Sequence, residues 1–363
     1  MSASDIPAQI APSASATSDV SQSRRHGKRF LNSRVLTQPS LLQNLRIAWR
    51  FLTKDTAHTI PGGSIPVREL SQSELLQAPD NTLYRLGHST LLMKIGGGFW
   101  LTDPVFSERA SPFSWLGPQR FHQPPISLQD LPPLRGVILS HDHYDHLDYA
   151  TILQLKDKTA FFLTPTGVGQ RLIRWGVAPS QVREHAWWDS SDIDGIRFVA
   201  TPAQHFSGRS VHDRDQTLWA SWSIISPELR IFFSGDSGYF SGFKEIGDKL
   251  GPFDLSLIET GAYDPMWPDI HMQPEQSLQA HLDLRARTML PIHNGTFDLA
   301  MHHWYEPFER ITQLAARQGV RLSTPQMGEA VDIAEPQQGR RWWLFPSTRG
   351  SNRRSFWCLA CHE

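Results

Sequence analysis

The sequence predicts an α+β sandwich, and its hydrophobic pattern supplies the reasons. Residues 82–103 alternate apolar and polar positions on both sides of Gly96-Gly97-Gly98, which indicates a hairpin that opens a sheet. Short apolar runs then recur along the chain, and helical patterns lie between several of them. Because hairpin-like neighbours are mixed with intervening helices, a sandwich is favoured over a doubly wound parallel sheet.

The elements that follow the hairpin are short and of mixed type. Strands are expected at 136–140, 159–164, 196–201, 218–225, 229–234 and 255–259. Helices are expected at 167–175, 273–282 and 307–318. Segments 104–135 and 262–272 are rich in proline and aromatic residues without a regular period, so we expect long loops that frame a site.

The composition limits the classes of protein to consider. The chain has 363 residues, which suits one main domain with a tail. Its 35 Lys and Arg against 36 Asp and Glu give no reason to expect a nucleic-acid partner. No stretch approaches the roughly 20 apolar residues that span a bilayer. Without an export signal, we expect a cytoplasmic protein, with peripheral contact at the inner membrane as an option.

The ends of the chain differ in character from its centre. Residues 1–28 show no strand or helix period and are expected to form a disordered tail, whereas 29–335 are expected to form the functional domain. A second tail of uncertain structure is expected at 336–363, which holds the only two cysteines. Cys358, Cys361 and His362 match the spacing that attaches c-type haem, but no secretory route or pocket supports it, and we interpret the match as accidental.

Residues Leu41 to Leu52 have apolar positions at helical spacing, an N-cap candidate in Ser40, and basic residues between them. One interpretation is a helix packed on the domain. The other is a basic amphipathic anchor on a membrane surface.

The stretch SHDHYDHLD, residues 140–148, holds three histidines and three aspartates directly after an apolar run. His141 and His143 are two apart, so an extended backbone would project both imidazoles to one side. Asp145 and His146 come from the following turn. Nitrogen ligands combined with a carboxylate suit a borderline ion such as zinc. The close spacing makes a chance excess of histidine in a polar surface loop a poor alternative.

Three residues further along the chain also follow apolar runs, namely His205, Asp236 and His293. Taken singly, each has a structural explanation as a capping histidine, a turn aspartate or a packed histidine. Because one loop rarely completes two coordination spheres, their shared position after a strand predicts that they supply the remaining ligands.

In the order HxHxDH, then His, Asp and His, the chain resembles the metallo-β-lactamase superfamily. The further motifs TDPVFSERASPFSWLGPQRF, PAQHFSGR, FFSGDSGY, GAYDP and IHNGTF are similar to its N-acyl-phosphatidylethanolamine-hydrolysing phospholipase D branch. The resemblance covers about residues 80–312, the expected core of the hydrolase domain. It implies an αβ/βα four-layer sandwich of two mixed β-sheets flanked by helices.

The resemblance also implies the ligands of two metal ions. The first ion would be held by His141, His143 and His205, the second by Asp145, His146 and His293, with Asp236 as the bridge. Two Zn²⁺ are expected, with iron or manganese as alternatives, because ligand type alone does not fix the metal. His88 and Asp103 match family positions and are expected to orient ligands, unless their role is purely structural.

The implied reaction is hydrolysis by metal-activated water, without a protein nucleophile. Asp145 and Asp236 would orient that water, and His271 would donate to the substrate oxyanion; a helix neighbour without a chemical role is the alternative for His271. Proton delivery to the leaving group stays open among water, His271 and a ligand aspartate. His281, His302 and His303 are expected to be packing or surface residues.

The implied substrate is a phosphodiester with long acyl chains, cleaved to phosphatidic acid and an N-acylethanolamine. Five residues could line an acyl groove or pack within their own loop: Phe106, Phe113, Trp115, Leu116 and Phe121. Two alternatives stay open. The same site could hydrolyse a lactone, a cyclic phosphodiester or another soluble ester, or the protein could be a metal-bound regulator without turnover. The expected partners are a phospholipid or a small-molecule ester, and an oligomer is compatible with the sequence.

Overall fold

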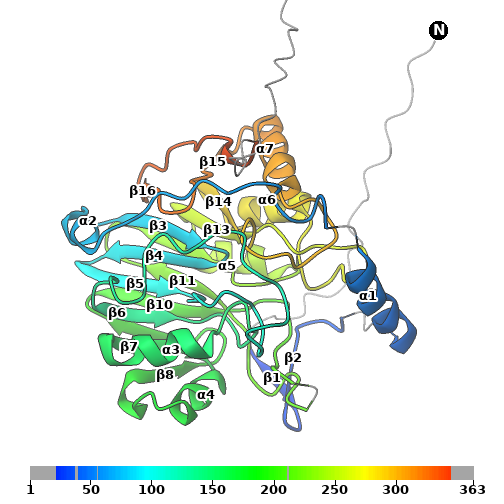
Figure 1. Ribbon diagram of the computed structural model, residues 1–363. Coiled ribbons are helices and arrows are strands. Elements are labelled where there is room, and N and C mark those ends of the chain that lie inside the picture. Colours follow the sequence, from blue (N-terminus) through cyan, green and yellow to red (C-terminus); the bar gives the residue numbers. More distant parts are fainter. Residues whose placement is uncertain (1–21, 37–39, 55, 211, 345–363) are drawn as a thin grey trace, which may run out of the picture.

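A computed structural model describes residues 22–36, 40–54, 56–210 and 212–344 of the chain. Two mixed β-sheets of seven strands each pack face to face, and helices cover the outer face of both (Figure 1). The predicted α+β sandwich with four layers is therefore confirmed.

The first sheet has the strand order β16-β3-β4-β5-β6-β7-β8. Its strands are β3 (Thr82–Gly87), β4 (Thr90–Ile95), β5 (Gly98–Thr102), β6 (Leu134–Ile138), β7 (Thr159–Pro165), β8 (Val182–His185) and β16 (Ala330–Asp332). Pairing is antiparallel from β16 to β5 and parallel from β5 to β8. The predicted hairpin at 82–103 is thus the start of a three-stranded meander.

The second sheet has the strand order β15-β14-β13-β12-β11-β10-β9. Its strands are β9 (Ser190–Ile193), β10 (Ile196–Thr201), β11 (Ser221–Ile225), β12 (Arg230–Phe233), β13 (Leu255–Glu259), β14 (Thr288–Ile292) and β15 (Arg321–Leu322). Pairing is antiparallel from β9 to β12 and parallel from β12 to β15. Because β10 and β12 are both antiparallel to β11, they run in one direction, and β14 runs with them.

Helices fall into two groups, one for each sheet. The first sheet is covered by α2 (Gln72–Gln77), α3 (Tyr149–Leu155) and α4 (Val168–Arg174). The second sheet is covered by α5 (Gly242–Leu250), α6 (Pro274–Asp283) and α7 (Glu306–Gln318). The expected helices correspond to α4, α6 and α7, whereas α2, α3 and α5 were not predicted.

The layers follow from alternation along the strands. On β4, Met93 faces the space between the sheets and Leu92 faces the helices. Between the sheets, the rings of Trp100 and Phe198 lie 4.3 Å apart. Gly136 on β6 makes room for this indole, because an added Cβ would lie 2.4 Å from the Trp100 ring. Each large side chain buried in this way contributes about 1.5–3 kcal/mol to folding.

The amino-terminal segment is more ordered than the sequence suggested. Residues 24–28, placed in the predicted tail, belong to a hairpin of β1 (Arg24–His26) and β2 (Arg29–Leu31). The pairing register is set by the turn at Gly27, which has φ 60°, and by Phe30, which is buried in the core between the sheets. Residues 1–21 of the predicted tail lie outside the described residues.

The predicted helix after Ser40 is α1 (Leu41–Thr53). Ser40 Oγ accepts from the backbone N–H of Gln43 at 3.2 Å, and Gln43 Oε1 accepts from the N–H of Ser40 at 2.7 Å, which forms a capping box. None of the described helices has both the length and the apolar character needed to cross a bilayer.

The carboxy-terminal segment packs on the domain beyond residue 336. Trp342 and Trp343, in the short 3₁₀ turn Trp342–Leu344, are buried against Phe308 and Trp304. The two cysteines and His362 lie outside the described residues.

Candidate metal centre

The loop after β6 carries four of the predicted ligands. Its entry is fixed by Asp103, whose Oδ1 accepts from the backbone N–H of Ser140 at 2.7 Å. A turn follows, in which the N–H of His146 donates to the carbonyl of His143 at 3.1 Å. The loop ends where Asp148 caps α3 by accepting from the N–H of Ala150. The sequence after the strand therefore encodes a tight, polar turn at the edge of the sheet.

Both sheets bring their strand ends to this loop. His205, Asp236 and His293 follow β10, β12 and β14, which run in one direction and end at one edge of the second sheet. The two edges are joined directly, since the N–H of His293 donates to the carbonyl of His88 at 3.2 Å. The seven predicted ligands are therefore neighbours in space.

The first cluster contains His141, His143 and His205. His143 Nδ1 lies 2.8 Å from Nε2 of His141 and 3.3 Å from Nε2 of His205. His143 Nδ1 can form a good hydrogen bond with only one of the other two nitrogen atoms at a time. A cation bound among the three rings would accept a lone pair from each of them.

The second cluster contains Asp145, His146 and His293. Asp145 Oδ2 lies 3.4 Å from Nε2 of His146 and 3.3 Å from Nε2 of His293. His88 approaches the same oxygen with Nε2 at 3.1 Å, so it contacts the carboxylate of a predicted ligand.

Asp236 lies between the two clusters. Its Oδ2 is 3.7 Å from Nε2 of both His141 and His205 and 3.1 Å from Nε2 of His293, while its Oδ1 is 3.1 Å from Nε2 of His146. One carboxylate thus faces donors from both clusters, which is the position expected of a bridging ligand.

Buried atoms without partners support a metal at this position. Within the described part of the chain, His146 Nε2, His293 Nε2 and Asp236 Oδ1 are buried and make no hydrogen bond. Buried polar atoms rarely stay unsatisfied, and these three face one another. The donor set of imidazole and carboxylate fits zinc, iron or manganese.

Other side chains hold the ligands in place. Asp103 Oδ2 accepts from Nδ1 of His146 at 2.6 Å, which fixes the ring with Nε2 toward the centre. The Nδ1 of His205 lies 3.0 Å from the carbonyl of Ile270. The side-chain amide of Asn32 pairs with the backbone of His205, at 2.7 Å to its carbonyl and 3.0 Å from its N–H.

The charges of the centre match metal binding. Burial, with His146 nearby, lowers the pKa of His141 well below its usual range, so this ring is neutral and can coordinate. Burial would raise the pKa of Asp236, but His146 and His293 outweigh it and hold the pKa well below its usual range. Burial lowers the pKa of His293, yet Asp236 and Asp145 outweigh it and raise the pKa to about 10. The carboxylates therefore require positive charge beside them, and an ion bound by His293 would have to replace the proton of that ring.

His271 lies next to the ligands, as predicted. Its ring is 5.2 Å from the rings of both His205 and His293. Its Nδ1 contacts the carboxylate of Glu259, which is fully buried at the end of β13. The sequence analysis did not identify Glu259, because it counted this residue as the end of an apolar strand.

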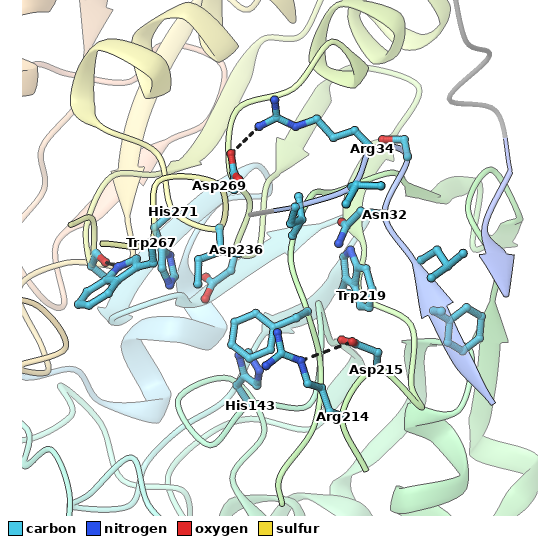
Figure 2. A pocket seen from close by; sticks show the side chains of 18 of the residues that line it. Asn32, Arg34, His143, Arg214, Asp215, Trp219, Asp236, Trp267, Asp269 and His271 are labelled. Carbon is cyan, nitrogen blue, oxygen red and sulfur yellow. Dashed lines mark hydrogen bonds and ion pairs between the residues drawn. The ribbon is translucent and has the colours of Figure 1, made fainter. Parts of the chain in front are cut away.

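A cavity of about 690 Å³ opens onto the centre, since His143, Asp145, Asp236, His271 and His293 all line it. Figure 2 shows side chains that surround it, among them Trp219, Trp267 and His271. Apolar walls are provided by Phe30, Ile47, Phe51, Phe206, Trp219 and Trp267. An elongated apolar group with a polar end suits this space.

Of the two alternatives for the five aromatic and apolar residues of loop 104–135, the structure does not support the acyl groove. None of the five lines this cavity. Phe106 packs beneath the first sheet's helices and Phe121 packs near Trp304. Phe113, Trp115 and Leu116 lie exposed on their loop. The apolar walls include Phe30, Ile47 and Phe51, which lie far from the predicted ligands along the chain. No local pattern in the sequence reveals such a long-range contact.

The remaining histidines follow the expectation. His281 is buried with Nδ1 2.8 Å from Ser256 Oγ, and His302 packs on the ring of Tyr263 at 4.3 Å. His303 is exposed. Neither His281 nor His302 lines the cavity at the centre.

Comparison with known proteins places these features in context. Residues 100–294 match the model of the family described as beta-lactamase superfamily domain. An N-acyl-phosphatidylethanolamine-hydrolyzing phospholipase D of Caenorhabditis elegans is 33% identical over 336 residues, which cover 86% of this chain and 94% of that protein. An uncharacterized protein of Mycobacterium tuberculosis is 46% identical over 261 residues, 71% of this chain and 70% of that protein.

Among solved structures, an isothiocyanate hydrolase from Delia radicum gut bacteria superposes with a TM-score of 0.55 at 21% identity. The superposition covers 69% of this chain and 98% of that one. At this level of identity, the likeness supports the sandwich fold.

Proposed function

The chain belongs to the beta-lactamase superfamily and is a metal-dependent hydrolase, and we propose that it cleaves N-acyl-phosphatidylethanolamine-like lipids as a phospholipase D. The products would be phosphatidic acid and an N-acylethanolamine. One observation carries the proposal: two clusters of ligand-type side chains, joined by Asp236, form the floor of a large apolar cavity. The identity to a worm phospholipase D of this specificity supports it.

Two ions, most simply Zn²⁺, would be held by the predicted ligands. The first would bind His141, His143 and His205, the second Asp145, His146 and His293, with Asp236 between them. When bound, such ions supply Lewis acidity, which acidifies water and stabilises charge on a phosphoryl oxygen.

Side chains of the protein would position the attacking water and the substrate. The carboxylates of Asp145 and Asp236 would accept hydrogen bonds from the attacking water and so aim it at the phosphorus. His271 would donate from its free nitrogen to a phosphoryl oxygen, because Glu259 already occupies its Nδ1. The acyl chains would lie against Phe51, Phe206 and Trp267, which exclude water from the reacting bond.

The test combines metal analysis with product analysis. Elemental analysis of the protein as isolated should find two metal ions per chain. The same sample should convert a diacyl N-acylated phosphatidylethanolamine to phosphatidic acid and an N-acylethanolamine, identified by mass spectrometry. Turnover of lactones or cyclic phosphodiesters without turnover of the lipid would support the alternative hydrolase. A metal-loaded protein that is inert toward the whole panel would support a regulatory role.

A further inference from the structure

The basic residues near the amino terminus are unusually concentrated. Residues 24–54 contain eight Lys and Arg and no Asp or Glu, although the whole chain carries 35 basic and 36 acidic residues. Their positions are Arg24, Arg25, Lys28, Arg29, Arg34, Arg46, Arg50 and Lys54. The net charge of the whole chain is close to zero, but this segment is strongly positive.

The fold places this segment around the opening of the cavity. Hairpin β1–β2, the stretch 32–36 and helix α1 all contribute lining residues, including Phe30, Val35 and Ile47. Figure 1 shows the hairpin and α1 at the same end of the molecule, beyond the edges of the sheets. A partner that contacts this segment would therefore lie at the entrance to the centre.

Part of the segment is tied firmly to the domain. Arg34 pairs with Asp269 at 2.8 Å, and Lys54 pairs with Asp298 at 2.6 Å. The backbone N–H of Phe30 donates to the carbonyl of Asp215 at 2.7 Å. These bonds hold the surface in a fixed position, so its exposed groups are presented together.

Other cations of the segment face solvent. Lys28 in the turn of the hairpin and Arg46 on α1 are exposed, and neither forms an ion pair with any residue that the structure describes. Such cations attract a partner with negative charge.

Exposed apolar side chains share the same surface. On α1, Leu42, Leu45 and Trp49 are 79%, 59% and 64% exposed, and Val35 in the preceding stretch is 97% exposed. The spacing of Leu42, Leu45 and Trp49 puts them on one side of the helix. A nucleic acid would satisfy the cations but would leave these groups in water, whereas a bilayer satisfies both.

We propose that residues 24–36 and 40–54 form a docking surface for a membrane that contains anionic phospholipid, and that docking places the bilayer at the mouth of the cavity. Basic residues would contact the head groups, while Leu42, Leu45 and Trp49 would enter the interface between head groups and acyl chains. The purpose of docking rests on the proposed function, but binding itself requires neither metal nor hydrolysis.

The experiment measures co-sedimentation of the full chain, treated with chelator, with two kinds of vesicle. One kind is phosphatidylcholine alone, and the other is phosphatidylcholine with phosphatidylglycerol. The protein should sediment with the anionic vesicles, and binding should weaken as salt is raised. Because hydrolysis is absent from this assay, its failure is distinguishable from failure of the proposed function.

Matched variants locate the surface. Lys28→Glu with Arg46→Glu should weaken binding to anionic vesicles by about tenfold or more, since each cation near the bilayer contributes separately. Leu42→Ser with Leu45→Ser should also weaken it. The control is Arg174→Glu with Arg317→Glu, which changes the same charge at exposed positions on α4 and α7 and should bind as the parent does. Hydrolysis of a soluble phosphodiester should be unchanged in all three variants.

Several outcomes would overturn the proposal. Equal binding to neutral and anionic vesicles would remove the role of the cations. Equal loss in the control variant would mean that net charge, not this segment, governs binding. Binding to an oligonucleotide without binding to vesicles would identify a polyanion as the partner.

Discussion

The carboxylate of Glu259 contacts Nδ1 of His271 beside the metal centre, and both oxygens of this buried side chain are engaged. Oε1 faces the imidazole, while Oε2 accepts from the backbone N–H of Ser237, the residue after Asp236. Burial raises the pKa of Glu259. One hydrogen is shared between Oε1 and Nδ1; when Glu259 carries it, Nε2 holds the ring hydrogen that His271 can donate.

Glu259→Leu should therefore impair His271 without removing a predicted metal ligand. Leucine has no polar atom, so Nδ1 of His271 and the N–H of Ser237 both lose their partner. We expect kcat to fall about 10- to 100-fold with KM and metal content nearly unchanged, as for other residues that orient a functional group. Steady-state kinetics with elemental analysis checks this. A large loss of metal would instead assign Glu259 to the support of Asp236.

Asp236→Asn should lower metal occupancy and abolish hydrolysis, because this side chain faces donors from both clusters. The fold should persist, since Asp236 contributes to the centre and not to the apolar core. The measurements are metal content, turnover and the melting temperature. Asp157→Asn, at an exposed position, is the matched control. Unchanged turnover in Asp236→Asn would contradict the bridging assignment.

Phe51→Asp tests the walls of the cavity. Phe51 lines the cavity and stacks on Trp267 at 6.1 Å between ring centroids. Loss of its apolar contact with substrate should raise KM for a long-chain lipid about tenfold, with little effect on a short, soluble phosphodiester. Phe113→Asp serves as the control, because Phe113 is exposed and does not line the cavity. Equal effects of both variants would restore that loop as a substrate site.

The free energy of unfolding should fall at acid pH, in part because His281 is buried. Burial lowers the pKa of His281 from 6.5 to about 4. The unfolded chain then binds more protons than the folded chain between these values, so stability is complete above pH 6.5 and is lost as pH falls toward 4. Urea unfolding at pH 7 and pH 5 should show a loss that is about 2 kcal/mol smaller in His281→Gln than in the parent. An identical loss in both proteins would contradict a neutral, buried His281.

The sequence allowed prediction of the side chains that gather at the centre because they follow apolar strands, and strand ends gather at sheet edges. We could identify His141, His205 and His293 without knowing how the strands pair. The residues that line the cavity could not be predicted in the same way. Asn32 reaches His205 across 173 positions of the chain, and no local periodicity encodes such a contact. For Phe113 and Trp115 the sequence left two alternatives open, because an aromatic residue in a long loop has no periodicity that shows which way its side chain points.

The predicted ligands are divided between the two sheets. His141 to His146 follow β6, whereas His205, Asp236 and His293 follow strands of the other sheet. A fragment that ends before β9 and a second fragment that begins with it would each carry an incomplete set of donors. Reassembly of active protein from the two pieces should then depend on the concentration of free cation as well as on that of polypeptide, with the ions acting as a third component of the complex.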